Sequence, residues 1–193
     1  MGEQRIVLID ADTVWRKNFK AMLGKYGYWV VGEAGDGLSA LKLVRSRQPD
    51  LLIIDAALPG MDGLQVAKIV HDDKLAPVVA TSTSNQQGIM EKAKEAGVYA
   101  LLIKPVSETS LIPTVELALA NYQEIMNLEK KIKDLQETLE TRKLVERAKG
   151  ILMETHGLSE AEAFRRIQRQ SMNKRVSIRV VAEAVIMSQA LNK

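Results

Sequence analysis

Five polar side chains in the first 104 residues follow short apolar runs, and together they suit phosphoryl transfer. They are Asp10, Asp12, Asp55, Ser82 and Lys104. A carboxylate can attack phosphorus, a divalent cation can neutralise the oxygens, and a hydroxyl and an ammonium can bind the transferred group. Asp55 alone is also typical of a turn, since Asp before Pro-Gly is common turn chemistry. The combination of residue types at these spacings favours the phosphoryl chemistry.

The elements that would position these residues alternate between strands and helices. Amphipathic stretches predict helices at about 14–26, 37–47, 63–71 and 86–96. The order predicts an α/β fold, a doubly wound, flavodoxin-like sheet of five parallel strands. The loops at the carboxyl ends of such strands meet at one edge, where the polar residues fall. The strand candidates are residues 6–9, 30–31, 51–54, 77–80 and 100–103.

This part of the chain resembles the receiver domain of response regulators. The segments that carry the resemblance are RIVLIDAD, VVGEAGDG, PDLLIIDAALPGMDG, APVVATSTS and AGVYALLIKPV. The resemblance implies that a sensor histidine kinase phosphorylates Asp55, that Ser82 and Lys104 bind the phosphoryl group, and that Pro105 follows a cis peptide bond. It also implies an Mg²⁺ site made by Asp10, Asp55 and the backbone carbonyl of Ala57, with Asp12 as a further candidate. Catalysis is expected only for the transfer onto Asp55 itself.

Two positions depart from the receiver pattern. Receivers usually have two adjacent acidic residues after the first strand, whereas Ala11 follows Asp10 here. Losing a carboxylate should weaken Mg²⁺, which binds oxygen ligands in a near-octahedral shell. Leu101 occupies the position where receivers commonly have Tyr or Phe. Two hypotheses follow: a phosphorylation switch that binds Mg²⁺ weakly, or a receiver kept as a dimerisation or docking module.

A long helix is predicted after the receiver, beginning near Ser107. Between Leu111 and Glu154 the only glycine is Gly150, and the only proline is Pro113 near the start. Apolar residues within it are spaced three and four apart, which indicates a coiled-coil seam and a homodimer. The alternative is an amphipathic helix that folds back on its own domain. The seam residues are Ile125, Leu128, Ile132, Leu135 and Leu139.

The last part of the chain is basic and helical. Residues 141–193 contain 11 Lys and Arg against 5 Asp and Glu, which suggests a polyanionic partner, although a solvated basic helical surface explains the charge equally well. Gly157 is predicted to end the long helix, and Ser159 with Glu162 forms a capping box for the next one. A final helix at 178–190 is largely apolar and is expected to be buried.

Residues 139–186 resemble the ANTAR domain of antitermination regulators. The resemblance is carried by Ala148-Lys149-Gly150, by Glu-Ala-Phe at 162–164 and by Ser171-Met172. It implies binding of paired RNA hairpins in nascent leaders, which prevents formation of a terminator. The domains predicted are a receiver at 1–120, a coiled-coil linker at 121–141 and an ANTAR RNA-binding domain at 142–193.

Cationic side chains supply the predicted RNA contacts, because RNA carries a phosphate on every nucleotide. Phe164 is the one aromatic residue of this region and is expected in the core, which leaves stacking to arginine. His156 is expected to be a helix-end residue. The predicted RNA-binding residues are Arg142, Arg147, Lys149, Arg165, Arg166, Arg169, Lys174 and Arg175.

Two other functions compete with RNA binding. A DNA-binding response regulator is one, but the last helix has a single Arg and makes a poor recognition helix. A signalling adaptor that works without phosphorylation is the other. The absence of cysteine excludes disulfides and thiolate metal sites. Since no apolar run is long enough for a membrane span, we expect a cytoplasmic protein.

Overall fold

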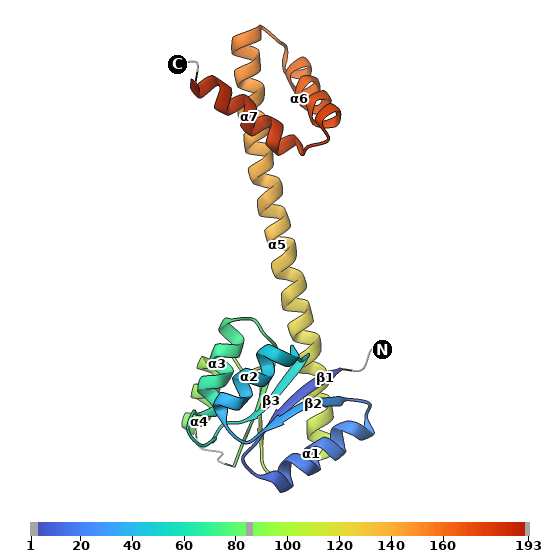
Figure 1. The fold of residues 1–193 in the computed structure, drawn as a ribbon, viewed down its shortest axis with the longest axis vertical. Helices are drawn as coiled ribbons and strands as arrows, with labels where there is room; N and C mark the ends of the chain where they lie inside the picture. Colours follow the sequence, from blue (N-terminus) through green and yellow to red (C-terminus); the bar gives the residue numbers. More distant parts are fainter. Residues whose placement is uncertain (1–3, 84–86, 192–193) are drawn as a thin grey trace. The chain divides into compact units, whose positions relative to one another are not determined.

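The computed structural model describes residues 4–83 and 87–191, and its chain forms two compact units, Met1–Ile125 and Met126–Lys193. The first unit contains a sheet of five parallel strands in the order β2-β1-β3-β4-β5. The predicted doubly wound fold is therefore confirmed (Figure 1). The strands are β1 (Arg5–Ile9), β2 (Trp29–Ala34), β3 (Leu51–Asp55), β4 (Val78–Ser82) and β5 (Ala100–Ile103).

Helices cover both faces of this sheet. Helices α2 (Gly37–Arg47), α3 (Gly63–Asp72) and α4 (Gln87–Glu95) pack on one face. Helix α1 (Thr13–Lys25) and the first turns of α5 (Glu108–His156) pack on the other. Successive strand residues point to opposite cores, which explains why the inner strands are apolar at every position. The predicted start of the fourth helix at residue 86 lies outside the described residues.

Short polar side chains determine where several helices begin. The carboxylates of Asp12, Asp36 and Asp62 accept hydrogen bonds from backbone N–H groups at the starts of α1, α2 and α3. Strand β2 is longer than the predicted residues 30–31. It is half-exposed, because it lies at the edge of the sheet.

The second unit is built on the end of α5. Helix α6 (Glu160–Lys174) begins with the predicted capping box of Ser159 and Glu162, and α7 (Ile178–Leu191) follows. The core joins α5, α6 and α7 through seven buried side chains. They are Val145, Ala148, Leu152, Ala163, Ile167, Val181 and Ala182.

Two expectations about burial in this unit are wrong. Phe164 is 41% exposed, because it is one residue past Ala163 and therefore turned about 100° round α6 from that core position. Helix α7 buries one face only, with Val180 and Met187 exposed. The apolar character of these residues does not predict either result. The orientation of each helix about its own axis determines which side chains are buried in the core.

Gly63 is expected to be needed for the loop after β3. A Cβ atom at this position would lie 1.8 Å from the backbone oxygen of Asp55. We expect Gly63→Ala to lower the free energy of unfolding by about 1–3 kcal/mol, the usual cost of overpacking. Urea unfolding followed by tryptophan fluorescence measures this, since Trp15 and Trp29 are both in the first unit.

Gly24 provides the matched control, because a Cβ atom there would meet nothing within 4 Å. Gly24→Ala, at the end of α1, is expected to be neutral or slightly stabilising. Equal unfolding midpoints for the Gly63→Ala and Gly24→Ala variants would contradict the proposed steric role of Gly63.

Candidate functional site

Lys104 joins two carboxylates at the carboxyl edge of the sheet. Its Nζ atom lies 2.5 Å from Oδ2 of Asp10 and donates a second hydrogen bond to Oδ2 of Asp55. All three side chains are almost fully buried. The parallel strands bring them together, since Asp10 follows β1, Asp55 ends β3 and Lys104 follows β5. The cluster carries one positive and two negative formal charges.

Two opposing effects act on the ammonium of Lys104. Burial lowers its pKa, but the hydrogen bonds and charges of Asp10 and Asp55 outweigh burial and raise the pKa above its ordinary value. The Trp15 ring lies 5.4 Å from Nζ, close enough for a cation–π contact. Lys104 is therefore held as a cation.

Asp55 has both carboxylate oxygens in hydrogen bonds. Oδ1 accepts a hydrogen bond from the backbone N–H of Ala57 at 3.0 Å, and Oδ2 accepts one from Nζ of Lys104. Ser82 is buried at the end of the neighbouring strand β4. The peptide bond between Lys104 and Pro105 is cis, as the resemblance implied. The predicted acceptor, hydroxyl and ammonium therefore share one edge of the sheet.

Asp12 is not part of the Asp10–Asp55–Lys104 cluster. Its Oδ1 atom accepts hydrogen bonds from the backbone N–H groups of Val14 at 2.7 Å and Trp15 at 3.3 Å, so it caps α1. Among residues 4–83 and 87–191, no three His, Cys, Asp or Glu side chains are grouped to hold a metal ion. Two carboxylates, of Asp10 and Asp55, and the Ala57 carbonyl remain as donors. This set fits Mg²⁺, which often retains waters and binds one or two carboxylates.

Two residues near the site were missed by the sequence analysis. Trp15 faces Lys104, and Arg16 donates a hydrogen bond to the backbone oxygen of Asp10 while lying 4.0 Å from Glu33. Both lie in the first turn of the helix that follows Asp10. The sequence did contain a signal for both residues. They follow Asp10 by only five and six positions, so the first turn of α1 brings them to the edge of the sheet where Asp10 lies.

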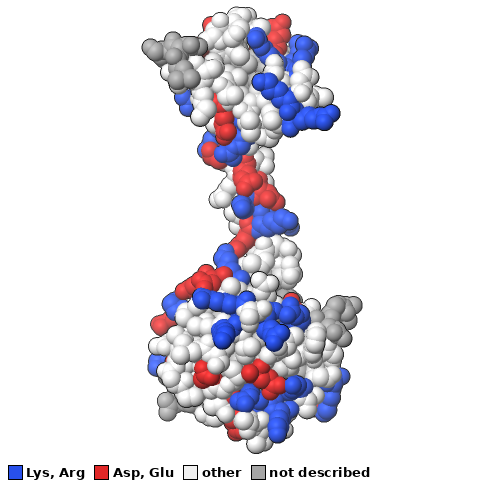
Figure 2. Space-filling view, viewed as in Figure 1, with Lys and Arg blue, Asp and Glu red and all other residues white. Residues whose placement is uncertain are grey.

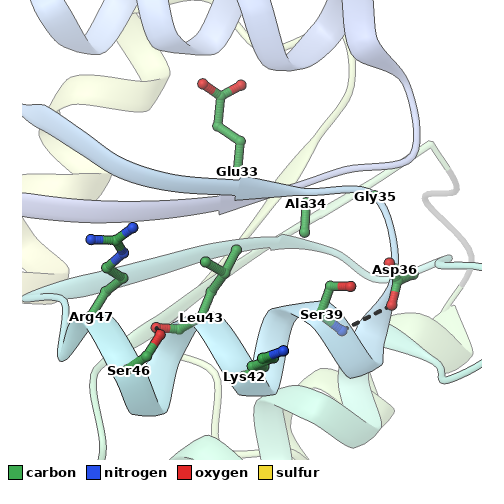
Figure 3. A pocket seen from close by; sticks show the side chains of 9 residues that line it. All are labelled: Glu33, Ala34, Gly35, Asp36, Ser39, Lys42, Leu43, Ser46 and Arg47. Atoms are coloured by element: carbon green, nitrogen blue, oxygen red, sulfur yellow. Dashed lines mark hydrogen bonds between the residues drawn. The ribbon is translucent and has the colours of Figure 1, made fainter.

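A separate hollow of 610 Å³ lies between β2 and α2 (Figure 3). Its walls include Glu33, Asp36, Lys42 and Arg47, and the Asp36 carboxylate accepts a hydrogen bond from the N–H of Ser39. None of the residues predicted to take part in phosphorylation lines it.

The predicted RNA-binding cations gather mainly on α6 (Figure 2). Arg165, Arg166, Arg169 and Lys174, with Arg175 just after the helix, are exposed. Within the described part of the chain no carboxylate forms an ion pair with any of them. Arg142 and Arg147 are exposed on α5. An array of exposed arginines that form no ion pair within the residues described suits contact with phosphates.

Lys149 differs from the other predicted RNA contacts. Its side chain is 9% exposed, and its Nζ atom lies 2.8 Å from Glu146 Oε2 and 2.7 Å from Glu160 Oε1. The hydrogen bonds to both carboxylates raise its pKa. Lys149 thus joins α5 to the first turn of α6, apart from the exposed arginines.

The five predicted seam residues of α5 are all exposed in the single chain. Their exposed fractions run from 41% at Ile125 to 69% at Leu135. An apolar stripe of this kind on a helix surrounded by charged residues is typical of a helix that binds a partner helix.

No helix among the described residues is long and apolar enough to cross a membrane.

Comparison with known families agrees with these two units. The model of the response regulator receiver domain matches residues 6–116, and the model of the ANTAR domain matches residues 133–186. The first match covers the Asp10–Asp55–Lys104 cluster, and the second covers α6 and its arginines.

Individual relatives match either most of the chain or its receiver part. The chain is 42% identical to the transcriptional regulatory protein PdtaR of Mycobacterium tuberculosis, over 95% of this chain and 89% of that protein. It is 30% identical to protein PilH of Pseudomonas aeruginosa, over 60% of this chain and 98% of PilH. The receiver domain of the putative response regulator NarL from Mycobacterium tuberculosis superposes with a TM-score of 0.59 at 30% identity, covering 61% of this chain and 97% of that domain. The chain belongs to the response regulators that combine a receiver domain with an ANTAR domain.

Proposed function

We propose that this response regulator binds RNA hairpins in nascent leaders and promotes transcription antitermination. The observation that carries the proposal is the array of exposed arginines on α6, none of which forms an ion pair with a carboxylate among the described residues. Phosphate contacts need such cations, whereas an arginine in an internal ion pair would first have to give up its partner. A sensor histidine kinase is the proposed phosphoryl donor.

The DNA-binding alternative is less well supported. Helix α7 would be the recognition helix, but its single arginine, Arg179, is paired with Glu183 at 2.9 Å. The exposed cations are instead on α6, where they favour a nucleic acid with accessible phosphates and loops. A basic surface without a nucleic-acid ligand, as in an adaptor, would show no preference for looped RNA over duplex.

Arg169 gives a direct test of the RNA-binding surface. We expect Arg169→Ala to weaken binding to a looped RNA hairpin and to lower the slope of log affinity against log salt by about 0.7–0.9, the value for one lost phosphate contact. Fluorescence anisotropy over a salt series measures both quantities.

Lys133→Ala is the matched control, since Lys133 is an exposed cation of α5 outside the array. It is expected to bind as wild type. Equal slopes for Arg169→Ala and wild type, or tighter binding of duplex DNA than of hairpin RNA, would count against the proposal.

Phosphorylation of Asp55 is the proposed input. The Oδ atom of Asp55 attacks phosphorus, the bond from phosphorus to the donor breaks, and Lys104 and Ser82 bind the transferred oxygens. Asp10, Asp55 and the Ala57 carbonyl would hold Mg²⁺, which supplies positive charge to the phosphoryl oxygens when bound. With Ala11 beside Asp10 and Asp12 capping α1, the site would bind Mg²⁺ weakly.

Ala11→Asp is expected to strengthen the Mg²⁺ site on the order of tenfold, because it adds a carboxylate beside Asp10. Ala11 is exposed, so the larger side chain can be accommodated. Titration of Mg²⁺ with a small phosphodonor, read by tryptophan fluorescence and by incorporated phosphate, measures the change. Ala11→Asn is the uncharged control, and Asp55→Asn should incorporate no phosphate. An Ala11→Asp variant with wild-type Mg²⁺ dependence would show that position 11 does not limit the metal.

Dimerisation through the seam is the proposed output. Two copies could bury the exposed residues from Ile125 to Leu139 against each other, and RNA with two hairpins would then bind both copies at a high effective concentration. Phosphorylation at the receiver would act by changing this equilibrium.

Leu135→Lys is expected to shift the monomer–dimer equilibrium toward monomer by at least about tenfold, because it places a charge in the seam. Sedimentation equilibrium measures the change. Glu137→Lys introduces the same side chain two residues away, outside the seam, and is expected to have little effect. Equal dissociation constants for the two variants would exclude the seam as the dimer contact.

A further inference from the structure

A hollow of 610 Å³ opens between α5 and the first turns of α6. It is lined by Glu146, Lys149, Ser159, Glu160, Ala161 and Phe164. We call it the Phe164 hollow. It lies within the second unit and beside Arg165, the first arginine of α6.

The aromatic wall of this hollow is unusual for the unit that contains it. Phe164 is the only Phe, Tyr or Trp in residues 141–193, yet 41% of it is exposed, while the small Ala163 beside it fills the core. The ring therefore offers one flat apolar face to solvent, next to the arginines of α6. A ligand with a flat apolar face would cover it.

The polar wall offers a defined set of hydrogen-bonding groups. The Lys149 ammonium is buried and donates to Glu146 and Glu160, whose side chains are 56% and 69% exposed. A carboxylate can accept further hydrogen bonds beyond the one from Lys149. With two carboxylates and one ammonium, the formal charge here is negative, which disfavours a phosphate. The wall therefore suits a neutral group that donates N–H bonds.

We propose that the Phe164 hollow takes one unstacked base of the RNA loop, an inference that rests on the RNA-binding function above. The base stacks on the Phe164 ring, and its exocyclic amino group donates to Glu146 or Glu160. The arginines of α6 bind the phosphates on either side. RNA loops are commonly read in this way, by stacking and by hydrogen bonds to base edges.

The chemistry selects among bases. Adenine, cytosine and guanine carry an exocyclic amino group with two N–H donors, whereas uracil has a single N3–H donor flanked by two carbonyl oxygens that the carboxylates would repel. The hollow should therefore prefer any amino-bearing base to uracil at one position of the loop.

Hairpins with one fixed stem provide the test. One has an all-uridine loop, and the others carry a single adenosine, cytidine or guanosine at each loop position in turn. We expect full-length protein to bind at least one substituted loop more tightly than the all-uridine loop. Phe164→Leu should weaken binding to that loop by about 5- to 150-fold, the effect of losing one stacked base. Its salt slope should not change, because no phosphate contact is lost.

Two further variants separate the contributions. Glu160→Gln places an amide N–H₂ where a carboxylate oxygen accepted, so it should reduce the preference over uridine. Met172→Ala removes another exposed apolar side chain of α6, outside the hollow, and is the matched control. Circular dichroism melting shows whether each variant is folded as wild type.

The results distinguish this inference from the function on which it rests. If hairpins bind with an Arg169-dependent salt slope but folded Phe164→Leu binds like wild type, the base site is wrong and RNA binding stands. A wild-type protein with equal affinity for every loop would also overturn the base site. If no hairpin binds at all, both proposals fail.

Discussion

The structure depends on one continuous helix, because α5 contributes to the cores of both units. Leu111 and Val115 are buried in the receiver core, and Val145 and Ala148 are buried in the C-terminal core. The apolar residues between them, from Ile125 to Leu139, are exposed. A helix repeats every 3.6 residues, so the sequence of α5 determines which face is buried at each end and which face stays open in the middle. Without α5, the second unit would lose one of the three walls of its small core.

The cationic side chains predicted to bind phosphate are of two kinds, the buried ones that have carboxylate partners and the exposed ones that form no ion pair with any described carboxylate. Lys104 is surrounded by Asp10 and Asp55, and Lys149 by Glu146 and Glu160. Buried ammonium groups need such partners, since an uncompensated buried charge is costly. The arginines of α6 are exposed and need none. The buried cationic side chains therefore stabilise the structure through ion pairs, whereas the exposed ones are accessible from solvent.

The receiver and the ANTAR unit share a reliance on pairs of carboxylates. In the receiver, Asp10 and Asp55 are held by one ammonium, and a phosphoryl group or cation would alter that balance. In the second unit, Glu146 and Glu160 lie beside an exposed ring and a basic helix. In each case two carboxylates share one ammonium, which leaves the cluster with a net formal charge of −1.

Local sequence patterns were enough to predict four features: the order of strands and helices along the chain, the edge where Asp55, Ser82 and Lys104 meet, the capping box at Ser159 and the length of α5. These features depend on local periodicity and on the rule that parallel strands end at one edge, so they could be predicted. Only the three-dimensional arrangement shows that Trp15 faces Lys104, that Lys149 is buried between two glutamates and that Phe164 is exposed. Each of these depends on competition between partners in space or on a rotation of about 100° per helical residue, which residue type does not encode.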